Sequence, residues 1–487
     1  MSEKSIKKNF IWNTLLKLSS IIFPLIIYPY VSRVIGVESI GRVSFATSVI
    51  SYFMIISQLG IPTYGIRIIA QNADNKQNLS KNTSEILYIN IFTTIIAYIV
   101  LGIMIAIVPR FHEDSFLLII TSLEMIFTTI GMGWLFSGLE QYSYITIRSL
   151  VIKLLSLVCI FIFVKNREDY FLYALILVLA IAGSGIINFF YSRKFVQLQR
   201  LKGLDYNAHI RPILVFFLMS VATTVYTSLD TIMLGFMTDN VAVGLYTSAI
   251  KVRSVLLGLV NALAVVVLPR ASYYVKENKI DDFVRVSRKT FHFIILIALA
   301  TWVYFSVFAK ECILVLSGKE FLGATAPMVI IMPTVLVCGL SNLTAIQMLV
   351  ALGKEKSVLV SQVIGAIIDF VLNFIFIPIY GASAAAGATL VAEVVILIIQ
   401  VHTLHKMDIK LSGSFKYYRV VLSILIAIIL CAWIKILDLN ALVTLIISAT
   451  IFFIVYAILL IAFKDSIAIE IFHDFIKKLN QKMKKNR

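Results

Sequence analysis

Two lysines interrupt long apolar segments of this sequence close to their midpoints. Lys153 and Lys251 lie too far from the ends of their segments for the ammonium group to reach the surface of a lipid bilayer. A charge at the bilayer centre costs at least about 2.5–3.5 kcal/mol, so such a group either pairs with an acid or faces water. An ammonium group in a low-dielectric cleft also attracts phosphate more strongly than one in bulk water. The two lysines therefore predict either buried ion pairs or a hydrated site for an anionic ligand.

Polar residues near such lysines recur at helical spacing. The face that holds Lys251 also carries Thr247, Ser254, Gly258 and Asn261. One face near the N-terminus carries Asn13, Lys17, Ser20, Pro24 and Tyr28. Lys17 lies about seven residues inside its segment, where it can either extend to the inner surface or face a cavity. The serines and threonines alone are also explained by packing between membrane helices.

Two arginines complete the candidate cations. Arg253 lies about 200° around the helix from Lys251, so the two cannot both face one narrow cavity. Arg33 lies near a helix end, from which its side chain can reach the lipid surface. The candidate substrate-binding set is Lys251, Lys17, Asn13, Lys153, Arg33, Arg253 and Asn261.

Acidic residues also fall within apolar segments, and each either pairs with a cation or faces water. Asp230 shares a helical face with Ser220, Thr224 and Thr227, and Asp369 shares one with Gln362 and Asn373. Pairing of Lys251 with Asp230 is the simplest alternative to a ligand site at that lysine. The full set of these acids is Asp230, Asp369, Glu124 and Glu393.

The elements that hold these residues are membrane-spanning helices. Of the 487 residues, 60% are apolar and 14% are charged, whereas a soluble domain averages about 45–50% and about 25%. The apolar runs are long enough for the roughly 20 residues that a spanning helix needs, and too long and uniform for barrel strands. Fourteen spans are predicted, over 10–32, 41–61, 86–108, 115–137, 143–164, 170–191, 212–236, 242–268, 290–311, 324–351, 357–378, 382–404, 417–437 and 440–463.

Basic residues are distributed unequally between the connecting segments. With the N-terminus inside, the inner segments carry 31 Lys or Arg and the outer loops carry 8. Cytoplasmic loops retain Lys and Arg, so the bias predicts that both termini are cytoplasmic and that the helix number is even. No basic segment is long enough to form a nucleic-acid-binding domain. The net charge of +17 is therefore attributed to topology, and no nucleic-acid partner is expected.

Cysteine and histidine give no sign of a metal or redox site. The four cysteines are isolated in apolar runs, and the six histidines lack any metal-ligand spacing. The sequence also lacks the G-x-x-x-x-G-K-[ST] loop that cradles nucleotide phosphates, which excludes ATP-driven transport by this chain alone. We expect no metal and no cofactor, and no catalytic residue is assigned.

The second half of the sequence repeats the first. Residues 40–46 at the start of the second span match residues 243–249 at the start of the eighth, and residues 138–141 match residues 353–356. Six helices per half implies two lobes related by an axis along the membrane normal. We predict an N-terminal lobe over 1–204, a C-terminal lobe over 205–409, two further helices over 410–465 and a basic cytoplasmic tail over 466–487.

Several motifs resemble a known family. The segments 24–36, 60–67 and 134–140, together with Asn373-Phe-Ile-Phe-Ile-Pro-Ile-Tyr-Gly-Ala382, are similar to those of the Wzx-type O-antigen and capsular-polysaccharide flippases. The resemblance covers essentially the whole chain. It implies the fold of the multidrug/oligosaccharidyl-lipid/polysaccharide (MOP) exporter superfamily, with fourteen helices, two six-helix lobes around a V-shaped cavity, and two C-terminal helices that often form a groove for a lipid tail.

The resemblance also implies a function. The substrate would be an undecaprenyl-diphosphate-linked oligosaccharide, moved from the inner to the outer leaflet of a bacterial cell membrane. Membrane lipid, a polysaccharide polymerase and chain-length machinery would be its partners. Buried carboxylates can exchange a proton or Na⁺ as access alternates, so Asp230, Asp369, Glu124 and Glu393 are the ion-coupling candidates.

Three alternatives remain open from the sequence. One is a multidrug or lipid II transporter of the same superfamily. A second is an enzyme, a membrane polysaccharide polymerase or glycosyltransferase, although the outer loops are too short for the catalytic segment such enzymes need. A third is a structural scaffold, which would not need charges within the membrane.

Overall fold

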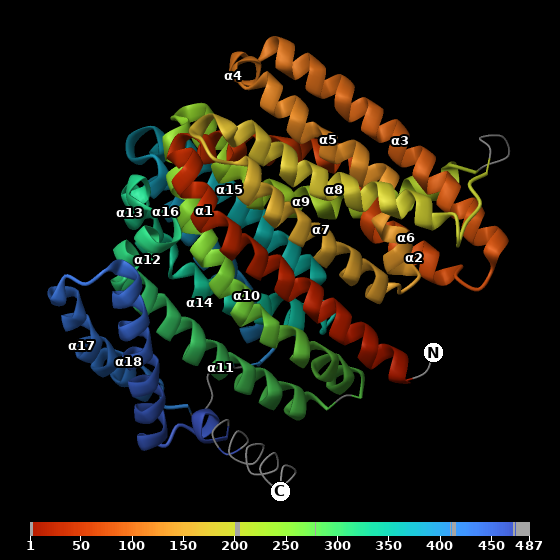
Figure 1. Ribbon diagram of the computed structural model, residues 1–487. Helices are drawn as coiled ribbons and strands as arrows, with labels where there is room; N and C mark the ends of the chain where they lie inside the picture. Colours follow the sequence, from red (N-terminus) through yellow and green to blue (C-terminus); the bar gives the residue numbers. More distant parts are fainter. Residues whose placement is uncertain are drawn as a thin grey trace, which may run out of the picture. The chain divides into compact units, whose positions relative to one another are not determined.

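The computed structural model describes residues 3–199, 205–277, 279–409, 411, 415–470 and 473. Throughout this described part the regular elements are helices, as the hydropathy pattern predicts (Figure 1). The chain divides into two compact units, Met1–Thr247 and Ser248–Arg487. The expected lobe boundaries after residues 204 and 409 adjoin residues outside the described part, and these boundaries stay predictions. Most of the expected tail over 466–487 also lies outside the described residues.

Within residues 3–199 and 205–247, the first unit contains nine α-helices, a short 3₁₀ turn and the beginning of a tenth helix. These elements are α1 (Glu3–Gln58), α2 (Ile61–Gln71), α3 (Lys76–Ile107), α4 (Pro109–Glu113), α5 (Ser115–Gly131), α6 (Gly133–Gly138), α7 (Tyr142–Phe163), η1 (Arg167–Asp169), α8 (Tyr170–Ser192), α9 (Asn207–Met237) and the start of α10 (Asn240–Lys276).

The second unit continues α10 and contains the remaining helices. These are α11 (Ile280–Val307), α12 (Ala309–Leu316), η2 (Lys319–Ala324), α13 (Thr325–Ile331), α14 (Thr334–Asn342), the π-helix η3 (Leu343–Val350), α15 (Glu355–Tyr380), α16 (Ala382–His405), α17 (Tyr417–Ala432), η4 (Trp433–Leu437) and α18 (Ala441–Ala462).

The membrane assignment is confirmed, but the count of fourteen spans is not. Within the described residues, ten helices are long and apolar enough to cross a bilayer, or eleven if the pair Lys319–Ile331 and Thr334–Val350, bent by 46°, is one span. The shorter α5, of 17 residues, does not reach this length. Each predicted span overlaps a helix of the structure. The chain is therefore a multi-pass membrane protein.

The long first helix is interrupted at a glycine. A continuous helix over the 56 residues of α1 would be on the order of 80 Å long, far more than a bilayer core of about 30 Å. Gly36 breaks it with φ 78° and ψ 175°, a conformation that side-chain-bearing residues rarely adopt. The break falls between the first two predicted spans, over 10–32 and 41–61, and separates them.

The core of each unit is formed by close helix pairs. In the first unit α5 packs along α8, where a glycine of each helix removes the side chain that would separate them. A Cβ added at Gly131 would lie 2.9 Å from the Cα of Gly185. In the second unit α15 packs along α16, and α17 along α18, the latter pair drawn in blue in Figure 1.

Two glycines from the repeated segments lie at close contacts in the first unit. A Cβ added to Gly41 of α1 would fall 1.7 Å from the carbonyl oxygen of Asn240, and one added to Gly244 of α10 would fall 2.1 Å from that of Val37. Each glycine is thus pressed against backbone near the other. Only glycine permits so close an approach of two helices here.

Candidate functional site

Lys153 is held against the polar face of α1. Its ammonium group donates to the hydroxyl oxygens of Ser19 and Ser20, both at 2.9 Å, and lies 6.0 Å from the ring centre of Phe23. Ser20 belongs to the polar face that the sequence predicts on this helix. Hydroxyls rather than carboxylates surround this cation, so its positive charge is solvated without being neutralised by these contacts.

Helix α1 also carries three other candidate residues, Asn13, Lys17 and Arg33. Lys17 is exposed and Asn13 is partly buried, on the half of α1 that precedes Gly36. Arg33 is exposed near the end of this half and donates to the carbonyl oxygen of Pro29, one turn earlier. This position fits the end-of-helix location predicted for Arg33.

Lys251 and Asn261 lie on α10 in the second unit. The side chain of Lys251 is exposed, and so is that of Ser254, one turn along the same predicted face. Asn261 is partly buried and accepts a hydrogen bond from the amide of Asn342 at 2.8 Å. This face of α10 therefore carries a lysine and a serine that are exposed residues, and an amide held in place by α14.

Arg253 lies in a different environment from its neighbour Lys251. Its guanidinium donates to Thr334 Oγ1 at 2.6 Å and to Cys338 Sγ at 3.2 Å on α14, and lies 3.6 Å from the carboxylate of Glu393 on α16. The side chains of Arg253 and Glu393 are 16% and 10% exposed. The structure thus joins one candidate for substrate binding and one for ion coupling in a single buried ion pair.

The remaining acids are buried to different extents. Asp230 on α9 is 6% exposed and accepts a hydrogen bond from the hydroxyl of Tyr246. Asp369 on α15 is 1% exposed, one helical turn before the fully buried Asn373. Glu124 on α5 is partly buried. The side chains of Thr224 and Thr227, expected beside Asp230, lie outside the described residues.

Sequence reasoning missed a buried polar cluster at the start of α9. His209 lies between the hydroxyl of Tyr64, 2.6 Å from its Nδ1, and the carboxylate of Glu85, 2.8 Å from its Nε2. The other Glu85 oxygen accepts from the backbone N–H of Asp205 at 2.7 Å. The cluster ties α9 to α2 and α3. Its members lie at the ends of apolar segments, where polar residues ordinarily face water, so spacing gave no signal.

Metal binding finds no support in the described part of the chain. No three His, Cys, Asp or Glu side chains there come close enough to hold an ion. Each of the four cysteines is a free thiol, three of them buried, as expected of small packing residues.

Comparison with known proteins points to a family. The family described as "Polysaccharide biosynthesis protein" matches residues 6–275. A protein of Escherichia coli K12 named "Putative O-antigen transporter" is 23% identical over 397 residues, covering 80% of this chain and 94% of its own. A Shigella dysenteriae protein of the same name is 25% identical over 406 residues, covering 80% of this chain and 98% of its own.

Solved structures share the fold. The lipid II flippase MurJ, in an inward closed conformation, superposes with a TM-score of 0.67 at 15% identity, covering 92% of this chain and all of MurJ. An inward-facing multidrug resistance MATE transporter of the MOP superfamily superposes with a TM-score of 0.61 at 15% identity, covering 82% and 98%. At such identities the likeness shows the fold alone, and that fold is the MOP fold that the sequence motifs imply.

Proposed function

Because the chain belongs to the polysaccharide biosynthesis protein family, we propose that it is a flippase for lipid-linked oligosaccharides. The observation that carries the proposal is the family match, supported by two relatives named as O-antigen transporters along four fifths of the chain. Both relatives are named as transporters and not as enzymes, which argues against the polymerase alternative.

The proposed substrate is an undecaprenyl-diphosphate-linked repeat unit, carried from the inner to the outer leaflet by alternating access. Its diphosphate and hydroxyl-rich glycan cannot cross hydrocarbon unaided, whereas its polyprenyl tail can stay in the bilayer. The chain offers matching chemistry in the exposed residues Lys17 and Lys251 and in Lys153, whose ammonium group donates to two hydroxyls. Charge attraction to a phosphate is strong at such low-dielectric positions.

Lipid analysis of a deletion strain tests this function. Loss of the protein should cause the lipid-linked repeat unit to accumulate in the cytoplasmic leaflet, while the peptidoglycan precursor stays at its normal level. The fold shared with MurJ makes a lipid II flippase the second candidate. Accumulation of lipid II instead would establish that alternative, and accumulation of neither lipid would favour a multidrug transporter.

We further propose that Lys251 holds the diphosphate. Lys251→Arg should then retain substantial export, whereas Lys251→Gln and Lys251→Glu should lose it at unchanged protein level. If Lys251 only neutralises an acid, the double change Lys251→Gln and Asp230→Asn should restore export. Full activity of Lys251→Glu alone would refute the diphosphate role.

Coupling to H⁺ or Na⁺ is proposed to depend on the acids within the membrane, Asp230, Asp369, Glu124 and Glu393. Replacing the coupling residue by its amide should remove the dependence of transport on pH or Na⁺ in vesicles with an imposed gradient. If all four single replacements keep both the rate and the ion dependence, coupling resides elsewhere.

We place the protein in a bacterial cytoplasmic membrane with both termini inside, beside the polymerase and chain-length machinery that would consume its product. The basic asymmetry of the sequence supports this orientation. Reporter fusions after Asn166 and after Asn240 should be active outside the cell. An external signal from a fusion after Gly203 would contradict the two-lobe topology.

A further inference from the structure

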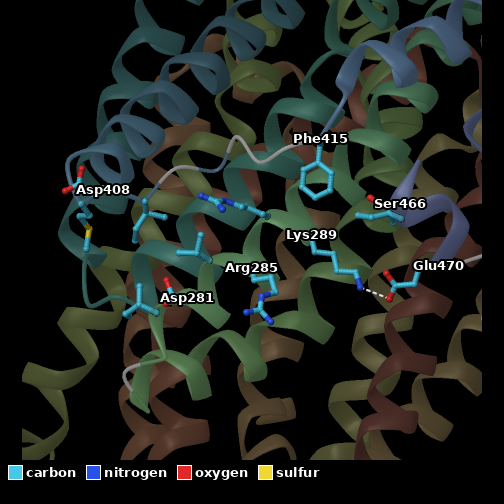
Figure 2. A pocket seen from close by; sticks show the side chains of 13 residues that line it. Asp281, Arg285, Lys289, Asp408, Phe415, Ser466 and Glu470 are labelled. Atoms are coloured by element: carbon cyan, nitrogen blue, oxygen red, sulfur yellow. Dashed lines mark hydrogen bonds and ion pairs between the residues drawn. The ribbon is translucent and has the colours of Figure 1, made fainter. Parts of the chain in front are cut away.

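A pocket of about 920 Å³ opens at one end of the second unit, and none of the residues that line it is a candidate transport residue (Figure 2). Its walls come from the first turns of α11, the connection between α16 and α17, and the segment that follows α18. These walls lie where α11 begins and where α16 and α18 end. The orientation proposed above from the positive-inside rule puts these helix ends on the cytoplasmic side of the membrane.

The lining combines an apolar wall with balanced charges. The apolar side chains are Ile280, Val284, Met407, Ile409, Phe415 and Ile467. The charged side chains are three cations and three carboxylates, namely Arg285, Arg288, Lys289, Asp281, Asp408 and Glu470. A pocket at the membrane surface with this lining can take a ligand that is partly apolar and carries both signs of charge.

The charges are separated across the pocket. Lys289 is paired with Glu470 at 2.6 Å on one side, whereas Asp281 and Asp408 lie on the other, as Figure 2 shows. Arg285 lies between these groups in that view, with its side chain 78% exposed and a contact of 3.3 Å to Asp282. An exposed pair of this kind is weak, so Arg285 can turn to a ligand at little cost.

A buried hydrogen bond between His292 and Asp465 fixes the wall of the pocket. His292 of α11 is fully buried, stacks on Phe415 with ring centres 4.2 Å apart, and contacts Asp465 at 2.8 Å. The second oxygen of Asp465 accepts the backbone N–H groups of Ile467 and Ala468, both at 3.1 Å. The lining residues Phe415 and Ile467 are thereby held in place before any ligand arrives, which lowers the cost of ordering them on binding.

Charge balance decides between the phosphate-bearing lipids of the inner leaflet. A polyprenyl diphosphate brings at least two negative charges to a pocket whose three cations are already matched by three carboxylates. A phosphoethanolamine headgroup brings one phosphate and one ammonium group and adds no net charge. Its phosphate suits the arginines, which bind phosphate by paired N–H donors, and its ammonium suits the carboxylates.

We propose that this pocket binds the zwitterionic headgroup of a phosphatidylethanolamine from the cytoplasmic leaflet. Arg285 and Arg288 hold the phosphate, Asp281 and Asp408 accept hydrogen bonds from the amine, and the apolar wall covers the glycerol and the first acyl carbons. The site is independent of what the protein transports, because none of its residues belongs to the proposed transport path.

Binding of short-chain lipids to the purified full chain in detergent tests the site. Dihexanoyl phosphatidylethanolamine should bind about tenfold more tightly than dihexanoyl phosphatidylglycerol, the factor that one additional charge-assisted hydrogen bond supplies. Phosphatidylcholine, whose ammonium has no N–H donor, should bind as weakly as phosphatidylglycerol. Free phosphoethanolamine should bind more weakly still, because it lacks the apolar part.

Two variants separate the two halves of the headgroup. Arg288→Gln should weaken the binding of both phosphatidylethanolamine and phosphatidylglycerol about tenfold. Asp408→Asn should weaken only the binding of phosphatidylethanolamine and so abolish its tenfold advantage. Asp408 has a φ of 57°, a conformation that Asn tolerates well, so this change keeps the backbone. Lys356→Gln, an equal charge change at an exposed site on α15, is the matched control and should change neither affinity.

Three results would overturn the proposal. Phosphatidylglycerol or undecaprenyl diphosphate binding as tightly as phosphatidylethanolamine would show attraction of anions alone. An effect of Lys356→Gln equal to that of Arg288→Gln would show that the pocket is not the binding site. An unchanged preference in Asp408→Asn would remove the amine contact. Each is read from binding without transport, so none depends on the proposed flippase activity.

Discussion

The ion pair between Arg253 and Glu393 permits a quantitative test of what Glu393 does. At 3.6 Å two unit charges attract by about 4–5 kcal/mol at an effective dielectric constant of about 20. Desolvation of both groups offsets much of this attraction, so the pair adds little net stability. Removing one partner is different, because the other is then left as an uncompensated buried charge.

We therefore expect Glu393→Gln to lower the free energy of unfolding by about 3–5 kcal/mol. Arg253→Gln should cost a similar amount, since it strands the carboxylate and removes the donors to Thr334 and Cys338. The double variant should recover to within about 1–2 kcal/mol of the original protein, because neither charge then remains unpaired. Denaturant titration of the purified protein in one detergent measures all four species.

An exposed pair supplies the control. The side chains of Arg285 and Asp282 lie 3.3 Å apart and are 78% and 40% exposed. The same set of two single variants and one double variant should there give an interaction energy of about 0–1 kcal/mol. The reasoning is refuted if the double variant at Arg253 and Glu393 is as unstable as the sum of the singles. If Glu393→Gln is as stable as the original protein yet loses ion-dependent transport, Glu393 is a coupling residue and not a structural partner.

Two further predictions concern packing and pH. Gly185→Ala should destabilise the protein by about 1–3 kcal/mol, because the new Cβ would lie 2.3 Å from the carbonyl oxygen of Phe127. Gly183→Ala on the same helix, whose Cβ would meet only a side-chain carbon at 3.8 Å, should be neutral or stabilising, and equal losses in thermal unfolding would contradict this account. Burial alone would raise the pKa of the Asp465 carboxyl, but hydrogen bonds from His292 and from two backbone N–H groups hold this pKa below its usual range. A depressed pKa stabilises the folded state above the unfolded pKa of about 3.9, so Asp465→Asn should lose about 1–3 kcal/mol at pH 7. That deficit should shrink as the pH falls through the folded pKa, and a deficit that is constant between pH 6 and 3 would refute the assignment.

The helical architecture was predictable because each spanning segment must satisfy its own backbone hydrogen bonds in lipid. An apolar run is therefore sufficient evidence for a helix, and the family motifs supplied the rest of the fold. The number of spans was harder, because sequence does not show that α5 is short or that α13 and α14 form a bent pair. The break at Gly36 was predicted as a connection of several residues, and the structure reduces it to one.

The partners of the polar residues were not predictable. Helical spacing tells which residues share a face, and it correctly separated Lys251 from Arg253. It does not tell which helix lies opposite, so neither the hydroxyl contacts of Lys153 nor the pairing of Arg253 with a residue 140 positions later could be found. The cluster around His209 was missed for the same reason, since the sequence carries no mark of which polar helix ends become buried.

The contact between Gly41 and Gly244 has an evolutionary consequence. If the two halves arose by duplication, these positions descend from one ancestral residue, and each now lies against backbone beside the other. A single-gene ancestor would have made the same contact between two identical copies, as in a symmetric dimer. After fusion the two positions could no longer change independently, because a side chain at either one would push apart the helices that both hold together. We expect homologues to keep a small residue at both positions, or to enlarge one only where the helix spacing at the other has also changed.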